Sequence, residues 1–185
     1  MQSQEVLFLL VKKTNNKLGR EFFIRDTLTV AKDLLGKFLI KDGFVVQINE
    51  VEAYIGDCDP ACHAFIGKTE RNKAMFEVGG TAYIYFIYGM YFCFNVVTEE
   101  EGRGCAILVR GAKVIKGVSA GVKTDGPGKL CRALGITKVD DGRDLCSDKS
   151  FYLCDRAFKP TDIRVSKRIG LTKGVELEWR FSCSI

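Results

Sequence analysis

Four side chains in this sequence combine a carboxylate with flat rings, at spacings that would let them meet. Glu52 and Tyr54 are two residues apart, so on a strand they share one face. His63 follows nine residues later and can fold back over that face, and Tyr85 lies in a tyrosine-rich segment. These residues predict a site that sandwiches a planar ligand between rings and places a carboxylate at the edge of the ligand.

The segment from Gly80 to Asn95 predicts two strands joined by a tight turn, because aromatic and β-branched residues dominate it. With residues 88–90 as the loop, Ile87 pairs with Tyr91, and a slip of one residue would mix the two faces. The even positions are apolar: Ala82, Ile84, Phe86, Phe92, Phe94 and Val96. The odd positions are mostly polar-tipped: Thr81, Tyr83, Tyr85, Tyr91, Cys93 and Asn95. We expect the even face to join a core, the odd face to form a ring-lined surface, and the tip to present Tyr88 and Met90.

Simpler interpretations of these residues stay open. A tyrosine-rich strand is often core or interface, and a lone histidine is often structural. A Cys62–His63 pair could act as nucleophile and base, but adjacent residues on an extended strand point to opposite faces. Cys58, Cys62 and His63 resemble a fragment of a zinc site, yet no second cysteine pair has matching spacing and the chain has a single histidine.

Four cations stand near these segments: Arg71, Arg110, Lys129 and Arg132. Surface solvation accounts for most of them. Arg110 differs, because it closes the apolar run 105–109 and a charge in that position needs a partner.

The composition is that of a globular protein. The chain has 185 residues, of which 46% are hydrophobic and 28% charged. We expect one domain over residues 1–185, with residues 1–20 less ordered. The apolar run Val6–Val11 is too short to span a bilayer and lacks the flanks of a signal peptide. The net charge of +5 permits a polyanionic partner, and eight cysteines without an export signal indicate reduced thiols in an intracellular protein.

Local signals place the first elements. Asp26 or Thr27 should cap a helix that runs to Leu35 and ends at Gly36. Strands are expected at 37–41 and 44–55, separated by a turn at 42–43. The polar stretch 57–79 predicts a loop with a short helix.

The second half continues the pattern. A charged loop is expected at 99–104, then a strand at 105–110. The Gly-Pro turn at 126–127 should begin a short helix whose N-terminus could receive a phosphate. Alternation at Ile163 and Val165, and again at Val175, Leu177 and Trp179, indicates further strands. The fold class is therefore α+β: a largely antiparallel, curved sheet flanked by helices, with a protruding hairpin.

Several of these segments together resemble a known family, in order and over nearly the whole chain. They are Glu52-Ala-Tyr-Ile-Gly-Asp with His63, Arg71-Asn-x-x-Met-Phe, Tyr83 to Asn95 with its Tyr-Gly-Met-Tyr-x-Cys-x-Asn core, Leu108-Val-Arg110, and Gly126-Pro-Gly-Lys-Leu-Cys131. This set closely resembles the alkyladenine (3-methyladenine, methylpurine) DNA glycosylases of the human type.

The resemblance implies roles for the residues that could do chemistry. Glu52 resembles the general base that activates the attacking water. Tyr54, His63 and Tyr85 resemble the groups that contact a base flipped out of the helix. Arg110 resembles an arginine near the catalytic carboxylate and the target phosphodiester.

It also implies how DNA would be held. Tyr88 resembles the hairpin-tip tyrosine that enters the minor groove and fills the gap left by the base, with Met90 beside it. Asn95 resembles the asparagine that obstructs the exocyclic amino group of guanine. Arg71 and Lys129 are expected to contact DNA.

We therefore expect an enzyme that hydrolyses the N-glycosidic bond of alkylated or deaminated purines and leaves an abasic site. Its partner would be double-stranded DNA, bound as a monomer through the minor groove, with no metal, cofactor or membrane. The loop at 99–104 differs in length from the mammalian one, and the long N-terminal extension of mammalian members is lacking. We thus expect a bacterial form, cytoplasmic at the nucleoid, or nuclear if eukaryotic.

Two other classes of protein stay open. A non-catalytic nucleic-acid binder would use the hairpin as a stacking platform, but it has little use for Glu52 and Arg110 near phosphates. An enzyme acting on a small heterocycle would use the pocket, but it has no need of Tyr88 and Met90 at an exposed tip.

Overall fold

The computed structural model describes residues 16–185. The apolar run Val6–Val11, which the sequence predicts to be too short for a membrane span, lies outside this part of the chain. Within it the strands are β1 (Phe38–Lys41), β2 (Phe44–Tyr54), β3 (Ala82–Ile87), β4 (Tyr91–Thr98), β5 (Cys105–Lys116), β6 (Phe151–Cys154), β7 (Ile163–Ser166) and β8 (Arg180–Cys183). The α-helices are α2 (Arg20–Phe23), α3 (Thr27–Leu34) and α4 (Pro127–Leu134). Short 3₁₀ helices are η1 (His63–Ile66), η2 (Lys73–Phe76) and η3 (Lys138–Asp140).

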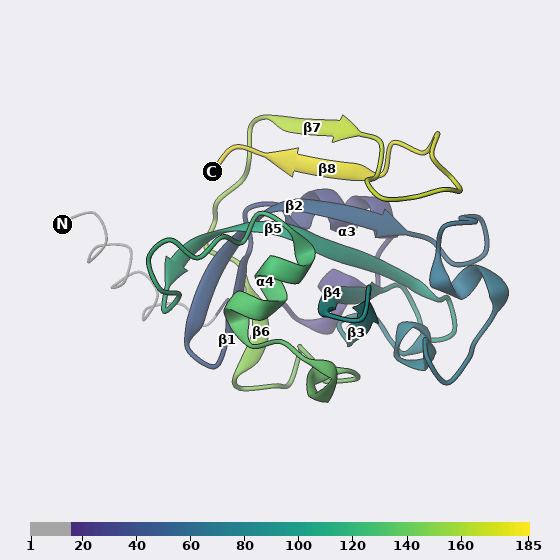
Figure 1. The fold of residues 1–185 in the computed structure, drawn as a ribbon, viewed down its shortest axis with the longest axis horizontal. Helices are drawn as coiled ribbons and strands as arrows, with labels where there is room; N and C mark the ends of the chain where they lie inside the picture. Colours follow the sequence, from purple (N-terminus) through teal and green to yellow (C-terminus); the bar gives the residue numbers. More distant parts are fainter. Residues whose placement is uncertain (1–15) are drawn as a thin grey trace.

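The strands form one antiparallel sheet in the order β3-β4-β5-β2-β1-β6, and the β7–β8 ribbon joins it through β2 (Figure 1). Strand β2 pairs with three other strands and so connects the parts of the sheet. Its first half pairs with β1 and its second half with β8, while β5 runs along its other edge. Irregularities in the β2–β5 register bend the sheet. The α+β class with a curved antiparallel sheet is confirmed.

Helix α3 begins and ends where the sequence predicts. The Asp26 carboxylate accepts a hydrogen bond from the Thr29 amide, which satisfies a backbone donor at the helix start. Past its end, Gly36 takes a positive φ of 81°. The face of α3 that carries Val30, Ala31 and Leu34 is buried against β2 and β5.

Helix α4 packs against β4 and β5, and a glycine allows the close approach. A Cβ added at Gly128 would lie 2.9 Å from Tyr91 on β4. Leu130, Cys131 and Leu134 enter the same core as α3, and Gly135 ends the helix with a φ of 64°. This core supports the base of the β3–β4 hairpin.

The hairpin has the predicted register, with Ile87 opposite Tyr91, but its two faces differ from the prediction. At the base, the even positions are buried as expected. Phe86, near the tip, is 45% exposed, unlike the even positions at the base. On the odd face, Tyr83, Cys93 and Asn95 are buried instead of forming a surface. Tyr83 and Asn95 lie against the loops between β2 and β3, which close over that side.

Those loops build a second, smaller core, here called the ring cluster. Its members are Cys62, Ala64, Ala74, Met75, Tyr83, Val97 and Ala106, with Tyr54, Phe76 and Tyr85 packed against them. The stretch 57–79, predicted as loop with a short helix, thus contains two 3₁₀ turns that cover the odd face of the hairpin.

Two predicted boundaries are wrong. Strand β5 continues six residues beyond Arg110 to Lys116, so Arg110 lies within a strand instead of closing one. The segment from Val175 to Trp179 is not a strand; the strand begins at Arg180.

Within the described residues, no helix has the length and apolar character that crossing a membrane would require.

Candidate active site

Glu52 lies in the second half of β2, opposite Leu108 of β5 and Arg180 of β8, and its side chain is fully buried. Its Oε2 accepts hydrogen bonds from the Tyr54 hydroxyl at 2.8 Å and from Arg110 Nη1 at 3.4 Å. Its Oε1 accepts one from the Ile169 amide at 2.7 Å. The carboxylate is therefore held at both oxygens, by three separate segments.

Arg110 has two carboxylate partners, as expected for a charged residue that follows an apolar run. Its Nη1 contacts Glu52, and its Nε donates to Glu50 Oε1 at 3.2 Å. The same Glu50 oxygen accepts from Arg180 Nε at 2.7 Å. Two carboxylates and two guanidinium groups thus alternate and neutralise one another.

Beside these four charged groups is a pocket of about 70 Å³, here called the ring pocket, which has room for several water molecules. Its walls are Tyr54, Ala61, His63, Met75, Tyr83, Tyr85, Asn95 and Leu171. The structure therefore brings together the predicted Tyr54, His63, Tyr85 and Asn95. Glu52 does not line the pocket; it lies behind the Tyr54 hydroxyl that it binds.

The rings of the pocket are locked to one another. His63 Nδ1 lies 2.9 Å from the Tyr83 hydroxyl, and the His63 ring meets the Tyr85 ring edge-on at 4.6 Å. Asn95 Nδ2 donates to the Tyr83 carbonyl at 3.1 Å, which orients the amide in the wall. A planar ligand would therefore enter a preformed slot.

The pocket walls are uncharged near neutral pH. Burial raises the pKa of Tyr85 and of Tyr83, and burial together with the charge of Glu52 raises that of Tyr54. Partial burial, followed by the charge of Arg71, lowers the pKa of His63, although the residue is exposed to solvent. Electron-rich neutral rings beside a carboxylate suit an electron-poor planar ligand.

The hairpin tip projects away from the protein. Tyr88 is 81% exposed and Met90 is 64% exposed. Tyr88 and Gly89 both have positive φ, 51° and 66°, and the Met90 amide donates to the Ile87 carbonyl. A tyrosine is rare in this backbone region, and such strain is typical of functional sites.

The two remaining predicted residues differ in their placement. Arg71 Nη2 reaches the Phe86 carbonyl at 3.5 Å, so it lies between the stretch leading to η2 and the hairpin, close to His63. Lys129 lies on α4, where it pairs with Asp125 at 2.9 Å and lines no described pocket with the others. The structure does not bring Lys129 to the ring pocket.

Several residues that build the site were missed by the sequence analysis: Glu50, Asp59, Met75, Arg168, Ile169 and Leu171. Glu50 was detectable, because it lies two residues before Glu52 on the same face of β2. Met75 lies in the single 3₁₀ turn η2, and the other four come from irregular loops, so no long periodicity marks which side chain points inward.

The alternative cysteine chemistry is not supported. Burial raises the pKa of the Cys62 thiol to about 12, and His63 Nδ1 is already bonded to Tyr83. All eight cysteines are free thiols. Within residues 16–185, no group of three or more His, Cys, Asp or Glu side chains could hold a metal ion.

Comparisons with known proteins identify the family of this chain. The family model for methylpurine-DNA glycosylase (MPG) matches residues 21–184. Relatives named "Putative 3-methyladenine DNA glycosylase" include one from Wolbachia pipientis wMel, 48% identical over 91% of this chain and 92% of its own. One from Sodalis glossinidius is 47% identical over 91% and 97%, and one from Rickettsia felis is 45% identical over 89% and 91%. These relatives are bacterial, so the human type is not confirmed. The chain belongs to the methylpurine-DNA glycosylase family.

Proposed function

We propose that this protein removes alkylated purines, 3-methyladenine among them, from duplex DNA by flipping the base into the ring pocket and hydrolysing its N-glycosidic bond. The observation that carries the proposal is the buried Glu52 carboxylate, which binds the hydroxyl of Tyr54, a ring in the wall of the pocket. A relative's name alone would support a glycosylase, whereas this arrangement supports a particular mechanism.

The first step is extrusion of the base, which costs a few kcal/mol, and less where pairing is weakened. Tyr88 is exposed at the tip of a tight turn and can fill the space that the base leaves. Wedges of this kind enter from the minor groove. We therefore place the duplex against the hairpin, with its minor groove over Tyr88 and Met90 and one protein monomer per lesion.

The second step is selection in the pocket. The extruded base regains stacking on Tyr54, Tyr85 and His63, worth about 1–3 kcal/mol per ring. A positively charged alkylated purine gains a further ~0.5–2 kcal/mol from ring faces that are shielded from water. The Asn95 amide, held by Tyr83, would meet the exocyclic amino group of guanine.

The third step is hydrolysis. A carboxylate has about four lone-pair positions, and the protein fills three of them on Glu52. The fourth, on Oε1, can accept a proton from a water. Glu52 then activates this water for attack at C1′ and stabilises the positive charge that develops on the sugar. A cationic purine leaves without acid help.

The product is an abasic site, without strand cleavage. A lyase step needs an amine that forms a Schiff base with the sugar. Among residues 16–185, no lysine lines the ring pocket or contacts Glu52. We therefore propose a monofunctional glycosylase.

The test is incubation with duplex oligonucleotides carrying 3-methyladenine, 7-methylguanine, hypoxanthine or ethenoadenine, followed by alkaline cleavage of abasic sites. We expect strand breaks only after alkali and only with lesion DNA, with an undamaged duplex of the same sequence as control. A trapped adduct in borohydride would overturn the monofunctional assignment.

The same oligonucleotides separate the two competing classes. A passive binder would retain lesion DNA without producing abasic sites. An enzyme for a free heterocycle would bind its ligand with little dependence on salt, whereas duplex binding should weaken steeply between 50 and 200 mM salt, about tenfold or more.

A further inference from the structure

Behind the ring pocket lies a buried ion pair between Arg168 and Asp59. Arg168 Nη1 donates to Asp59 Oδ2 at 2.5 Å and Nη2 donates to Oδ1 at 2.7 Å, and both side chains are fully buried. This two-pronged contact fixes the plane of the guanidinium as well as its position.

The pair joins three segments that are far apart in the sequence. Arg168 also donates to the Ala53 carbonyl at the end of β2, at 2.8 Å, and to the Gly174 carbonyl at 3.4 Å. Asp59 Oδ1 accepts from the Ala61 amide at 3.0 Å. Each segment supplies part of the pocket wall, namely Tyr54, then Ala61 with His63, then Leu171.

Arg168 does not contact Glu52, but it contacts or adjoins two groups that donate hydrogen bonds to Glu52. Its guanidinium lies over the Tyr54 ring, 4.6 Å from the ring centre, and the Tyr54 hydroxyl donates to Glu52. The next residue, Ile169, donates its amide to the other oxygen of Glu52. Two of the three hydrogen bonds to Glu52 therefore come from groups that Arg168 locates.

Stability alone is a weak reason for such a pair. Two charges lose their hydration on burial, and well-packed apolar residues often serve stability as well. Here Arg168 Nε is also buried without a hydrogen-bond partner. What the pair supplies is a defined geometry between chain segments that no regular secondary structure connects.

We propose that Arg168, anchored by Asp59, is a positioning residue that holds Tyr54 and the Ile169 amide in the arrangement that orients Glu52. The inference rests on the proposed function, because it assigns Arg168 to the rate of excision and not to DNA binding.

The variant that tests it is Arg168→Lys, which keeps the charge but cannot make the two-pronged contact or place a guanidinium over the Tyr54 ring. Its single-turnover excision rate on ethenoadenine DNA should fall about tenfold or more, because small displacements of catalytic groups are costly. The dissociation constant for the same DNA should stay within about threefold, because Tyr88 and the DNA surface are unchanged.

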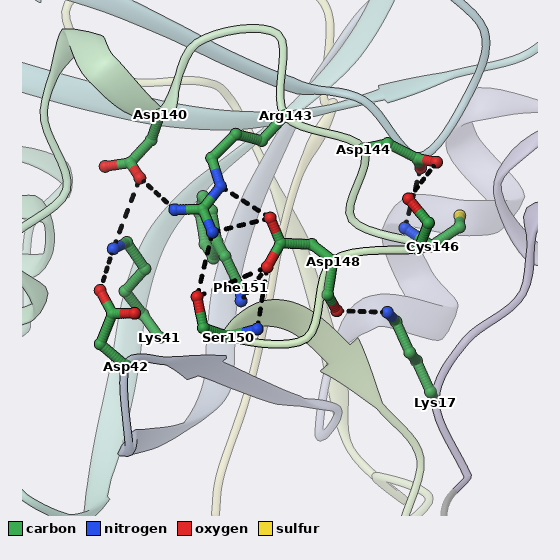
Figure 2. A network of polar contacts seen from close by, with 11 residues as sticks. Lys17, Lys41, Asp42, Asp140, Arg143, Asp144, Cys146, Asp148, Ser150 and Phe151 are labelled. Carbon is green, nitrogen blue, oxygen red and sulfur yellow. Dashed lines mark hydrogen bonds and ion pairs between the residues drawn. The ribbon is translucent and has the colours of Figure 1, made fainter.

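The chain offers a control in a second arginine network, between η3 and the loop before β6 (Figure 2). Arg143 binds Asp140 and Asp148, each at 2.7 Å, and lies over the Phe151 ring, but it lines no described pocket. Arg143→Lys should lower the melting temperature and leave the excision rate unchanged. A loss of melting temperature without a loss of rate in Arg168→Lys would overturn the inference.

A second variant covers the case in which Arg168→Lys does not fold. A Cβ at Gly174 would lie 3.1 Å from both Arg168 Nη2 and Asp59 Oδ1, and Gly174 has a positive φ of 57°, so Gly174→Ala shifts the pair and strains the backbone beside it without removing a charge. It should slow excision without weakening DNA binding, and an unchanged rate would overturn the inference. If the unaltered protein excises no lesion, the proposed function fails, and this inference fails with it.

Discussion

Each charge around Glu52 has an assigned partner, and this restricts what a substitution at the site can do. Glu50 and Glu52 face Arg110 and Arg180, so the four groups are neutral together. Removing one carboxylate leaves a partly buried guanidinium charge uncompensated, which costs stability as well as chemistry. A rate measurement at this site is therefore informative only beside a stability measurement.

For this reason we predict the behaviour of Glu52→Gln in two parts. The variant should still fold and bind lesion DNA, because its shape is retained, although its free energy of unfolding should fall by about 1–3 kcal/mol. Excision should fall about 10²–10⁴-fold, the usual contribution of a general base. Single-turnover kinetics and urea unfolding measure the two effects. Near-normal excision would remove Glu52 from the role of base.

At the scale of the element, the β3–β4 hairpin combines a strong pattern with a strained tip. The alternation of side chains sets the register, and α4 closes on its base through Gly128. The tip has a backbone that suits asparagine or glycine, yet it carries Tyr88 with a φ of 51°. This conflict between local preference and residue type supports a role for the ring itself.

The substitution Tyr88→Asn should therefore raise stability while it impairs function. Asparagine adopts this backbone region more readily, so the free energy of unfolding should rise by about 0.5–1 kcal/mol. Flipping, followed by the fluorescence of an ethenoadenine probe in duplex DNA, should decrease because the wedge is gone. Tyr88→Phe, which keeps the ring, is the control. Unchanged flipping in Tyr88→Asn would end the assignment of Tyr88 as a wedge.

At the scale of the whole molecule, polar networks hold the irregular segments to the sheet. Beside β1 and β6, Arg143 connects Asp140 of η3 with Asp148 and Ser150 in the loop before β6 (Figure 2). Asp148 also accepts from the Ser150 and Phe151 amides at 2.8 and 2.9 Å. These contacts order the segment 141–150, whose backbone in turn binds β3.

This network predicts a loss of stability in acid. Burial tends to raise the pKa of Asp148, but the amides of Ser150 and Phe151 and the Arg143 guanidinium hold it below the usual value of 3.8. A lowered folded pKa gives stability that is present above pH ~4 and is lost as the pH falls through the folded value. Asp148→Asn should be about 1–3 kcal/mol less stable at pH 7 and should lose less between pH 5 and pH 2.

Urea unfolding at several pH values checks this prediction, with Asp33→Asn as the control. Asp33 pairs with Arg25 on the surface, where ion pairs contribute little, so its substitution should barely change the curve. An Asp148→Asn curve parallel to that of the unaltered protein would contradict the prediction.

The sequence by itself determined the elements whose signals are local. The hairpin register and the shared face of Glu52 and Tyr54 follow from the period of two along a strand, and α3 follows from its caps. Only the tertiary structure decided which faces are covered. Phe86 is exposed and Tyr83 is buried because the loops of 57–79 close over one side of the hairpin alone.

The tertiary structure also decided how Glu52 is held. Asp59, Arg168 and Ile169 come from irregular loops, and Ile169 lies 117 residues from Glu52 along the chain. Their hydrogen bonds form through backbone amides and long side chains whose direction no sequence period encodes. Lys129 shows the converse, because a cation within a matching motif pairs with Asp125, which lies just before α4 and four residues away along the chain. Residue types can indicate a chemistry, but contacts between distant loops decide which groups take part in it.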